Sequence, residues 1–489
     1  MKKQFFYAAL AIGMMSSCTS SDLPGNQAPE EQLPEEERVA IELGISSPNA
    51  KIEASTKGIG SVGGTGVAGD ENKWNGEELG IWMYKVTRDA QGAITAEDHV
   101  NDLDDLKFQA PLAQDDPNNN PGKIRIISDD SGSPTKYKYV YYPSTGAYSF
   151  YGFHLDGADN VLGETPADVN KDNKTIKGLI IDGTQDIMTA GTMEVSQEKY
   201  AGTAQALPGE TQNEDWWTKA KNQSFSAWSA RRGIQPTLVF EHKLARLRFF
   251  VKAGDESAAA KKWNGTNAWI DRELANVDGI GEVTKAVQIT GISIENMAKT
   301  LDMQLSSTGN TLTEQENSDK GTFVLMQKPT SGTDRNLVTL QPVAPECWAD
   351  LSSSGATTAG DYKPTTQVGE SILFLPVSSN DAQNPGTDKE LKIAITVKQA
   401  VVDTYTETTI GHPVDETWIV KENTLTTTLK SSTIVPVGSE SASPEALFKP
   451  GNSYDIIITV YSYSKIEISA QLTKWENGGS INTAPGDEF

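Results

Sequence analysis

The chain has 489 residues, which at roughly 150 residues per domain suggests two or three domains or two large ones. It holds 42 Lys and Arg against 66 Asp and Glu, a formal net charge of −24. This balance argues against a nucleic-acid partner, because backbone phosphates would be repelled. Two cysteines and four histidines argue against a disulfide framework or a Cys/His metal cluster. The 42 Gly and 23 Pro indicate many turns.

The first residues have the layout of an export signal. Two lysines at positions 2 and 3 precede an apolar stretch over residues 5–15, which is too short to span a bilayer but typical of a signal-peptide core. Two serines then precede Cys18, and this arrangement resembles a bacterial lipobox, in which the cysteine is acylated. We therefore expect a lipoprotein signal peptide over residues 1–17, lipidation at Cys18 and attachment to a membrane by lipid. An ordinary cleaved signal with an incidental cysteine is the alternative.

The segment after Cys18 divides into a tether and a strand. Residues 19–38 contain three prolines, no aromatic residue and five Glu between positions 30 and 37, so they cannot bury enough apolar surface to fold. In residues 39–46, Val39, Ile41, Leu43 and Ile45 alternate with other residues, which predicts a strand with one buried face. Residues 47–73 are predicted as an exposed loop. A G-x-G-x-x-G pattern at 58–63 is not taken as a dinucleotide site, because no helical period follows it.

The remainder of the chain predicts strand after strand. Alternating or wholly apolar segments occur at residues 79–86, 136–143, 148–155, 242–251, 371–377, 391–397, 454–460 and 466–472. Such short segments between turns are typical of β-sandwiches. The best helical pattern covers residues 215–233 and contains Trp216, Trp217 and Trp228. These rings could stack on a sugar, but such a group more often packs a helix onto its own domain.

Signatures of enzymes are missing from the sequence. No G-x-S-x-G, H-E-x-x-H or G-x-x-x-x-G-K-[ST] occurs. Residues 168–173 imitate the start of a calcium loop, but the sixth position is Asn173 and the twelfth is Leu179 rather than Gly and Glu. We therefore expect no catalytic residue, no cofactor and no metal site.

Several segments, in order along the chain, resemble the fimbrillin family, the type V pilins of Bacteroidales. Besides the lipobox, these are T-K-G at 56–58 followed by W-N-G-E-E-L-G-I-W-M at 74–83, VYYPSTGAYSFYGF at 140–153, GTQDIMTAG at 183–191, VFEHKLARLRFFV at 239–251 and the segment 448–481. Lys57 stands where the family usually has Arg, and Glu77 where it has Asp. The chain is also longer than many members, with room for insertions such as 200–233.

The resemblance implies two tandem transthyretin-like Greek-key β-sandwich domains with few short helices, which we place at residues 58–235 and 236–489. It also implies an outer-membrane lipoprotein precursor from which a trypsin-like, Arg/Lys-specific protease removes the lipidated segment with the first strand. That propeptide would be residues 18–57. A strand from the next subunit then fills the groove, and head-to-tail polymerisation of fimbrial subunits gives a surface fimbria that supports adhesion.

Physical reasons select residues for this scheme. We expect the first strand to be an edge element, so that it can leave. A cut after Lys57 releases the strand, as does one after Lys51, whereas a cut after Arg38 leaves it in place, so the order of preference is Lys57, Lys51, Arg38. The donor strand is expected within residues 466–489, with Ile466, Ile468, Leu472, Trp475 and Ile481 as its apolar side chains.

Two other functions remain open from the sequence. The chain could be a fimbrial tip adhesin or accessory subunit that binds host or bacterial surface glycans or proteins, or a surface glycan-binding lipoprotein that never polymerises.

The distribution of charge along the chain shows which part of the acidity would remain after maturation. Residues 18–57 hold eight acids and three bases, and the remaining 58–489 carry −21, so the acidity belongs mostly to the processed protein.

Overall fold

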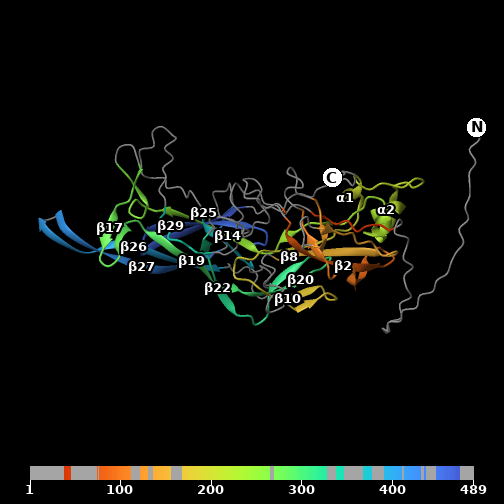
Figure 1. The fold of residues 1–489 in the computed structure, drawn as a ribbon, viewed down its shortest axis with the longest axis horizontal. Coiled ribbons are helices and arrows are strands. Elements are labelled where there is room, and N and C mark those ends of the chain that lie inside the picture. Colours follow the sequence, from red (N-terminus) through yellow and green to blue (C-terminus); the bar gives the residue numbers. More distant parts are fainter. Residues whose placement is uncertain are drawn as a thin grey trace, which may run out of the picture.

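The computed structural model describes residues 38–45, 74, 76–111, 122–129, 136–155, 168–264, 269–327, 338–345, 367–376, 390–409, 412–430, 434–436 and 448–473. Over these residues the regular structure is predominantly β-strand, which confirms the predicted all-β class. The molecule is elongated (Figure 1). We call the chain up to β13 (Glu241–His242) the first half and the chain from β14 (Ala245–Ala253) onward the second half. The first half forms the end with α1 (Gln197–Tyr200), α2 (Glu214–Asn222) and β2 (Glu78–Arg88). The second half reaches the opposite end with β17 (Leu274–Val277), β26 (Glu390–Thr409) and β27 (His412–Lys430).

Two sheets build most of the first half. The larger has the order β13-β11-β8-β2-β4-β6-β7, with β3 beside β2, and the smaller has the order β12-β1-β5. The strands are β1 (Gly44–Ile45), β2 (Glu78–Arg88), β3 (Ile94–Val100), β4 (Lys107–Gln109), β5 (Gly122–Lys123), β6 (Arg125–Asp129), β7 (Lys136–Tyr137), β8 (Ala147–Leu155), β11 (Ile187–Gly191), β12 (Thr237–Leu238) and β13 (Glu241–His242).

The central strands β2 and β8 are buried on both faces. Ile81 and Met83 of β2 point into one hydrophobic core, whereas Trp82 and Tyr84 between them point into a second core. This follows from the period of two in a strand, and it explains why both segments read as nearly continuous apolar runs.

A third sheet joins the two halves. Its order is β21-β20-β10-β9, with β9 (Asp168–Asn170) and β10 (Thr175–Ile180) from the first half and β20 (Thr300–Gln304) and β21 (Thr311–Glu314) from the second. Residues 168–173, which imitate a calcium loop in the sequence, form one strand of this β9–β10 hairpin and part of its turn. One hydrophobic core continues from Ile176 and Leu179 into the strands of the second half.

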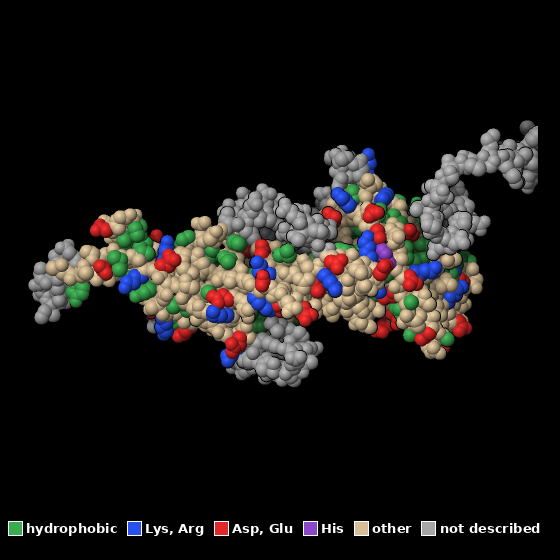
Figure 2. All heavy atoms as spheres, turned by 90° about the horizontal axis from the view of Figure 1, so that it is seen from below, with side chains coloured by type: hydrophobic (Ala, Val, Ile, Leu, Met, Phe, Trp, Pro, Cys, Tyr) green, Lys and Arg blue, Asp and Glu red, His purple; other side chains and the backbone are tan. Residues whose placement is uncertain are grey.

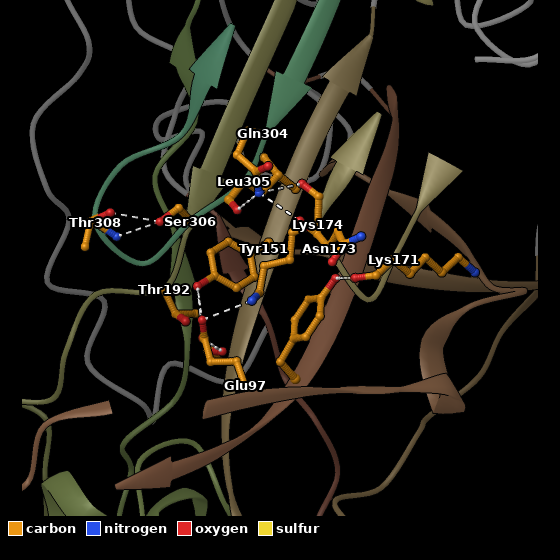
Figure 3. A network of polar contacts seen from close by, with 12 residues as sticks. Glu97, Tyr151, Lys171, Asn173, Lys174, Thr192, Gln304, Leu305, Ser306 and Thr308 are labelled. Carbon is orange, nitrogen blue, oxygen red and sulfur yellow. Dashed lines mark hydrogen bonds and ion pairs between the residues drawn. The ribbon is translucent and has the colours of Figure 1, made fainter. Parts of the chain in front are cut away.

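The β9–β10 turn is fastened by a network of polar contacts (Figure 3). Lys174, at φ 56°, places its Nζ 3.2 Å from Glu97 Oε2 and 4.5 Å from the centre of the Tyr84 ring. The Tyr151 hydroxyl donates to Glu97 Oε1 at 2.9 Å, and the Gln304 side-chain amide donates to the Asn173 carbonyl at 2.8 Å. Glu97 on β3 is thereby linked to the hairpin, and the hairpin to β20.

We predict that Lys174→Met lowers the free energy of unfolding by about 2–3 kcal/mol, because a nearly buried carboxylate loses its cation. Urea denaturation of the full chain measures this. The matched control is Lys177→Met, an exposed lysine on β10. Equal losses in the two variants would contradict the role of the Lys174–Glu97 pair.

The second half is built on two further sheets, with orders β25-β14-β29-β30-β28 and β18-β17-β27-β26-β19-β22. The first contains β14 (Ala245–Ala253), β25 (Gln367–Phe374), β28 (Val435–Pro436), β29 (Ser453–Ser462) and β30 (Lys465–Thr473). The second contains β17 (Leu274–Val277), β18 (Gly281–Thr284), β19 (Gln288–Ala298), β22 (Lys320–Val324), β26 (Glu390–Thr409) and β27 (His412–Lys430). Two small pairs complete it: β15 (Lys261–Trp263) with β16 (Trp269–Asp271), and β23 (Met326–Gln327) with β24 (Val338–Thr339).

The predicted alternation of β14 and β29 is confirmed. Ala245, Leu247, Phe249 and Val251 are buried, as are Tyr454, Ile456, Ile458 and Val460. At the far end, the outer part of the long β26–β27 ribbon forms a small separate core with Ala275 and Val277 of β17. Exposed apolar side chains gather at this end of the molecule (Figure 2), among them Ile280 and Tyr405.

The helical elements are short. They are the 3-10 turn η2 (Asn101–Leu103) and the helices α1 (Gln197–Tyr200), α2 (Glu214–Asn222) and α3 (Ala227–Ala230). The single helix that the pattern of residues 215–233 favours is wrong: the chain breaks between α2 and α3, where Phe225 has φ 48°. Ser226 starts α3 with a capping box.

Candidate functional site

The first described strand is anchored in the core of the first half. Ile41, Leu43 and Ile45 are 5%, 2% and 1% exposed and belong to the core that β2 and β8 line. Val39 is partly buried and packs against the same core. The predicted alternation is therefore confirmed, although regular pairing is limited to an isolated bridge at Ala40 and to β1 at Gly44–Ile45.

The expectation that this strand is an edge element is wrong. On one side β1 pairs with β12 in parallel, and Gly44 N donates to the Pro236 carbonyl at 2.9 Å. On the other side it is antiparallel to β5, where Ile124 N donates to the Leu43 carbonyl at 2.8 Å. The segment thus fills a slot between two neighbours, because its pairing partners come from distant parts of the chain that its own sequence does not reveal.

The antiparallel side extends toward the start of the segment. Ile41 N donates to the Val140 carbonyl at 2.7 Å, and Tyr142 N donates to the Val39 carbonyl at 2.9 Å. Removal of the segment would leave unpaired N–H and C=O groups on both walls of a groove with an apolar floor. Such a groove binds an incoming strand by β-augmentation.

The outer side of the strand has a different chemistry. Glu42, between the buried Ile41 and Leu43, pairs with Lys123 of β5 at 2.9 Å. The Arg38 guanidinium lies over the Tyr141 ring, 6.0 Å from its centre. Charged contacts therefore accompany the apolar ones.

The remaining predicted site residues are distributed as follows. Ile466 and Ile468 lie in β30, half-buried and packed against the core of the second half. Leu472 lies near the end of the same strand, paired with Tyr454 of β29. These three residues are therefore part of a sheet of their own chain. Cys18, Lys51, Lys57, Trp475 and Ile481 lie outside the described residues.

The tryptophans of α2 and α3 pack against their own domain. Trp216 is buried, and its ring contacts those of Trp217 and Trp228 at 4.8 and 5.7 Å between centres. Arg232 lies 3.8 Å from the centre of the Trp228 ring, and Lys219 lies 5.0 Å from it. Protein groups thus occupy the surfaces that a sugar would use, and the geometry favours the packing interpretation.

A carboxylate ties this helical segment together. Glu210 accepts from Arg232 Nε at 2.9 Å and from the Trp216 indole at 3.2 Å. The hydrogen bond from Arg232 lowers the pKa of Glu210 from 4.5 to about 2, against the opposing effect of desolvation. Sequence reasoning missed this pair, because twenty-two residues separate its partners.

We expect Glu210→Gln to lower the melting temperature at pH 6 and to have less effect near pH 2. Because the folded pKa is depressed, the contribution of ionised Glu210 is fully present above pH 4.5 and is lost as the pH falls through about 2. Melting curves of both proteins between pH 2 and 6 measure the difference. Glu214→Gln, at the start of α2, is the control, and a difference that does not depend on pH would contradict the assignment.

Two other kinds of site are absent from the described part of the chain. Within the residues described above, no group of three or more His, Cys, Asp or Glu side chains could hold a metal ion. In the same part of the chain, no helix has the length and apolar character needed to cross a membrane.

Comparison with known proteins gives structural neighbours only. No family model and no curated protein matches the chain. A candidate cell adhesion protein from Bacteroides uniformis is 12% identical with a TM-score of 0.35, over 91% of this chain and 100% of that one. The tip fimbrial protein Mfa3 from Porphyromonas gingivalis, truncated at its C-terminus, is 11% identical with a TM-score of 0.27, over 82% and 95%. The fimbrial anchor protein Mfa2 from the same organism is 9% identical with a TM-score of 0.25, over 89% and 99%.

These three solved structures are thus of one cell adhesion protein and two fimbrial proteins, from Bacteroides and Porphyromonas. The groove and its strand, rather than this likeness, indicate what the protein does.

Proposed function

We propose that the protein is a structural subunit of a bacterial surface fimbria, exported as an outer-membrane lipoprotein and polymerised by strand exchange after proteolysis. The observation that carries this proposal is the segment at residues 38–45, whose buried Ile41, Leu43 and Ile45 fill a slot between β5 and β12. A short N-terminal segment with this geometry can be replaced by another strand without rebuilding the fold around it.

The free energy of burial favours replacement of the first strand by a donor strand over its release into solvent. Burial of three aliphatic side chains contributes about 5–9 kcal/mol, at about 1.5–3 kcal/mol each. A cut in the following loop would therefore leave the strand in place until a donor strand re-buries the groove and restores its hydrogen bonds. Because the donor and the groove are different parts of the chain, the contact between two copies is heterologous, and its head-to-tail repetition produces a filament.

The test uses the precursor, residues 18–489, treated with a trypsin-like protease. We expect a ladder of SDS-resistant oligomers, lost in Lys57→Gln or in the double variant with Lys51→Gln, and retained in Arg38→Gln. Deletion of residues 480–489 should also abolish the ladder if the donor includes them. A chain that is cut after Lys57, loses residues 38–45 and stays monomeric would overturn the proposal.

A further inference from the structure

One face of the first half is basic although the chain as a whole is acidic. The outer sides of β1, β4, β5, β6 and β7 form it, together with residues 138–142. Phe108, Ile124 and Ile126 of these segments are buried on the inner side. Their neighbours along the chain are Lys107, Lys123 and Arg125, which therefore point outward. We call this surface the outer basic face.

Tyrosines and one acid complete the face. Tyr137 and Tyr139 are 42% and 72% exposed. Tyr141 pairs with Ala40 across the bridge to the first segment and lies beneath Arg38. Arg125 lies 5.0 Å from the centre of the Tyr137 ring. Glu42, which pairs with Lys123, is the one acidic residue among the described side chains of the face.

This arrangement links the outer basic face to the exchangeable strand. Glu42 leaves with residues 38–45, whereas Lys123 and Arg125, on either side of the Ile124 that pairs with Leu43, remain on the wall of the empty slot. Lys107 lies on β4, which pairs with β6 and not with the first segment. Whatever strand refills the slot therefore presents its own outward side chains to two basic residues, with Lys107 farther away on the same face. An acidic side chain at the place of Glu42 would satisfy Lys123.

The segment at residues 474–489 has such an acid at a suitable spacing. If Trp475 and Ile481 face the core, the alternation along a strand turns Glu476 and Glu488 outward. Glu476 also stands two residues before Gly478, as Glu42 stands two residues before Gly44. A small residue suits that position, because a Cβ at Gly44 would lie 3.1 Å from Thr237 Oγ1.

We propose that the outer basic face recognises the acidic segment 474–489 of a second copy of this chain, with Glu476 replacing Glu42 beside Lys123. This rests on the proposed strand exchange and adds a charge contact that selects the donor. In this register Trp475 takes the place of Ile41, whereas Asn477 and Gly479 take the places of the buried Leu43 and Ile45. The segment thus reproduces only part of the apolar contact, and the exposed charge contact acts on the rate and selectivity of encounter.

The test compares polymerisation of the full precursor after cleavage. Lys107 and Lys123 are both exposed, so the double variant Lys107→Glu/Lys123→Glu should fold. It should polymerise roughly tenfold more slowly at low salt, with the difference shrinking at higher ionic strength. The matched control is Lys177→Glu/Lys421→Glu, two exposed lysines elsewhere on the surface. Glu476→Lys/Glu488→Lys should slow assembly in the same way.

The decisive variant carries both pairs of substitutions, which restores opposite charges across the contact. Recovery of the rate supports the proposal. If Lys107→Glu/Lys123→Glu slows assembly but Glu476→Lys/Glu488→Lys has no effect, the proposal is overturned. The face would then bind another anion, such as an acidic glycan. A polymerisation rate that none of these variants changes would also overturn it. Single variants at Glu476 and Glu488 then identify the register.

A second measurement separates this inference from the proposed function. A fluorescent peptide with the sequence of residues 474–489 is added to the cleaved protein, and its anisotropy is followed. Binding that weakens with salt and with Lys107→Glu/Lys123→Glu supports the recognition even if no polymer forms. If the peptide fails to bind, or binds equally well after both lysines are changed, the recognition is wrong, whatever the outcome of polymerisation.

Discussion

Replacing Leu43 by aspartate is expected to release the first strand and to let the uncleaved precursor accept a strand from a second copy. Leu43 is 2% exposed, and a charged carboxylate at this position would be buried without a partner, which costs several kcal/mol. Together with the lost apolar burial of about 1.5–3 kcal/mol, this removes most of the 5–9 kcal/mol estimated for the three anchoring side chains.

The expected result is measured in two ways. Oligomers resistant to SDS should form without added protease, and trypsin should cut residues 38–57 faster than in the native precursor. Glu42→Gln is the matched control, because Glu42 lies on the outer side of the same segment and its loss leaves the core intact. If Leu43→Asp instead remains monomeric with an empty slot, polymerisation does not depend on this groove.

The strands could be predicted wherever one face or both faces carry apolar side chains. The segments that became β2, β8, β14 and β29 were of this kind, and their patterns alone were sufficient. The long β26–β27 ribbon extends well past the predicted segment 391–397, because its outer part is rich in threonine and carries little hydrophobic periodicity. Residues 136–143 show the converse. Their alternation predicted a strand, but regular pairing covers only β7, and Tyr139 is exposed.

The candidate site could be predicted only in part. The buried positions Ile41, Leu43 and Ile45 followed from the period of two. The two walls of the slot did not, because β5 and β12 reach β1 from about 80 and 190 residues away and pairing at such distances leaves no local signal. For the same reason the sequence did not show that Glu42 meets Lys123, or that Glu97 meets Lys174.

A buried polar cluster at the junction of the halves was also missed. Arg246 alternates with the buried Ala245 and Leu247 along β14, a pattern that predicts an exposed side chain, yet Arg246 is 2% exposed. Its Nε donates to the Ser453 hydroxyl at 3.1 Å. Desolvation, and after it the neighbouring Arg248, lowers the pKa of Arg246 to about 9. Nearby carboxylates, Asp186 and Asp455, oppose that shift and so favour the charged form.

Asp186→Ala is expected to be among the most destabilising single substitutions in the described part of the protein. Asp186 and His242 are 1% and 2% exposed, and their Oδ2 and Nδ1 atoms lie 2.7 Å apart. The substitution removes the carboxylate from His242 and from the surroundings of Arg246, so buried polar groups lose a partner. The free energy of unfolding should fall by about 3–5 kcal/mol. Asp186→Asn should cost less, since an amide can still form a hydrogen bond.

Urea denaturation measures the loss of stability, and hydrogen exchange locates it. Exchange should increase at β11, β13 and β14, the strands that carry the chain from the first half into the second. Asp168→Ala, an exposed acid on β9, is the control and should change little. A loss confined to one half would show that the two halves unfold independently. A loss in both would show that the junction couples the two halves, so that a change at one end of the molecule can affect the other.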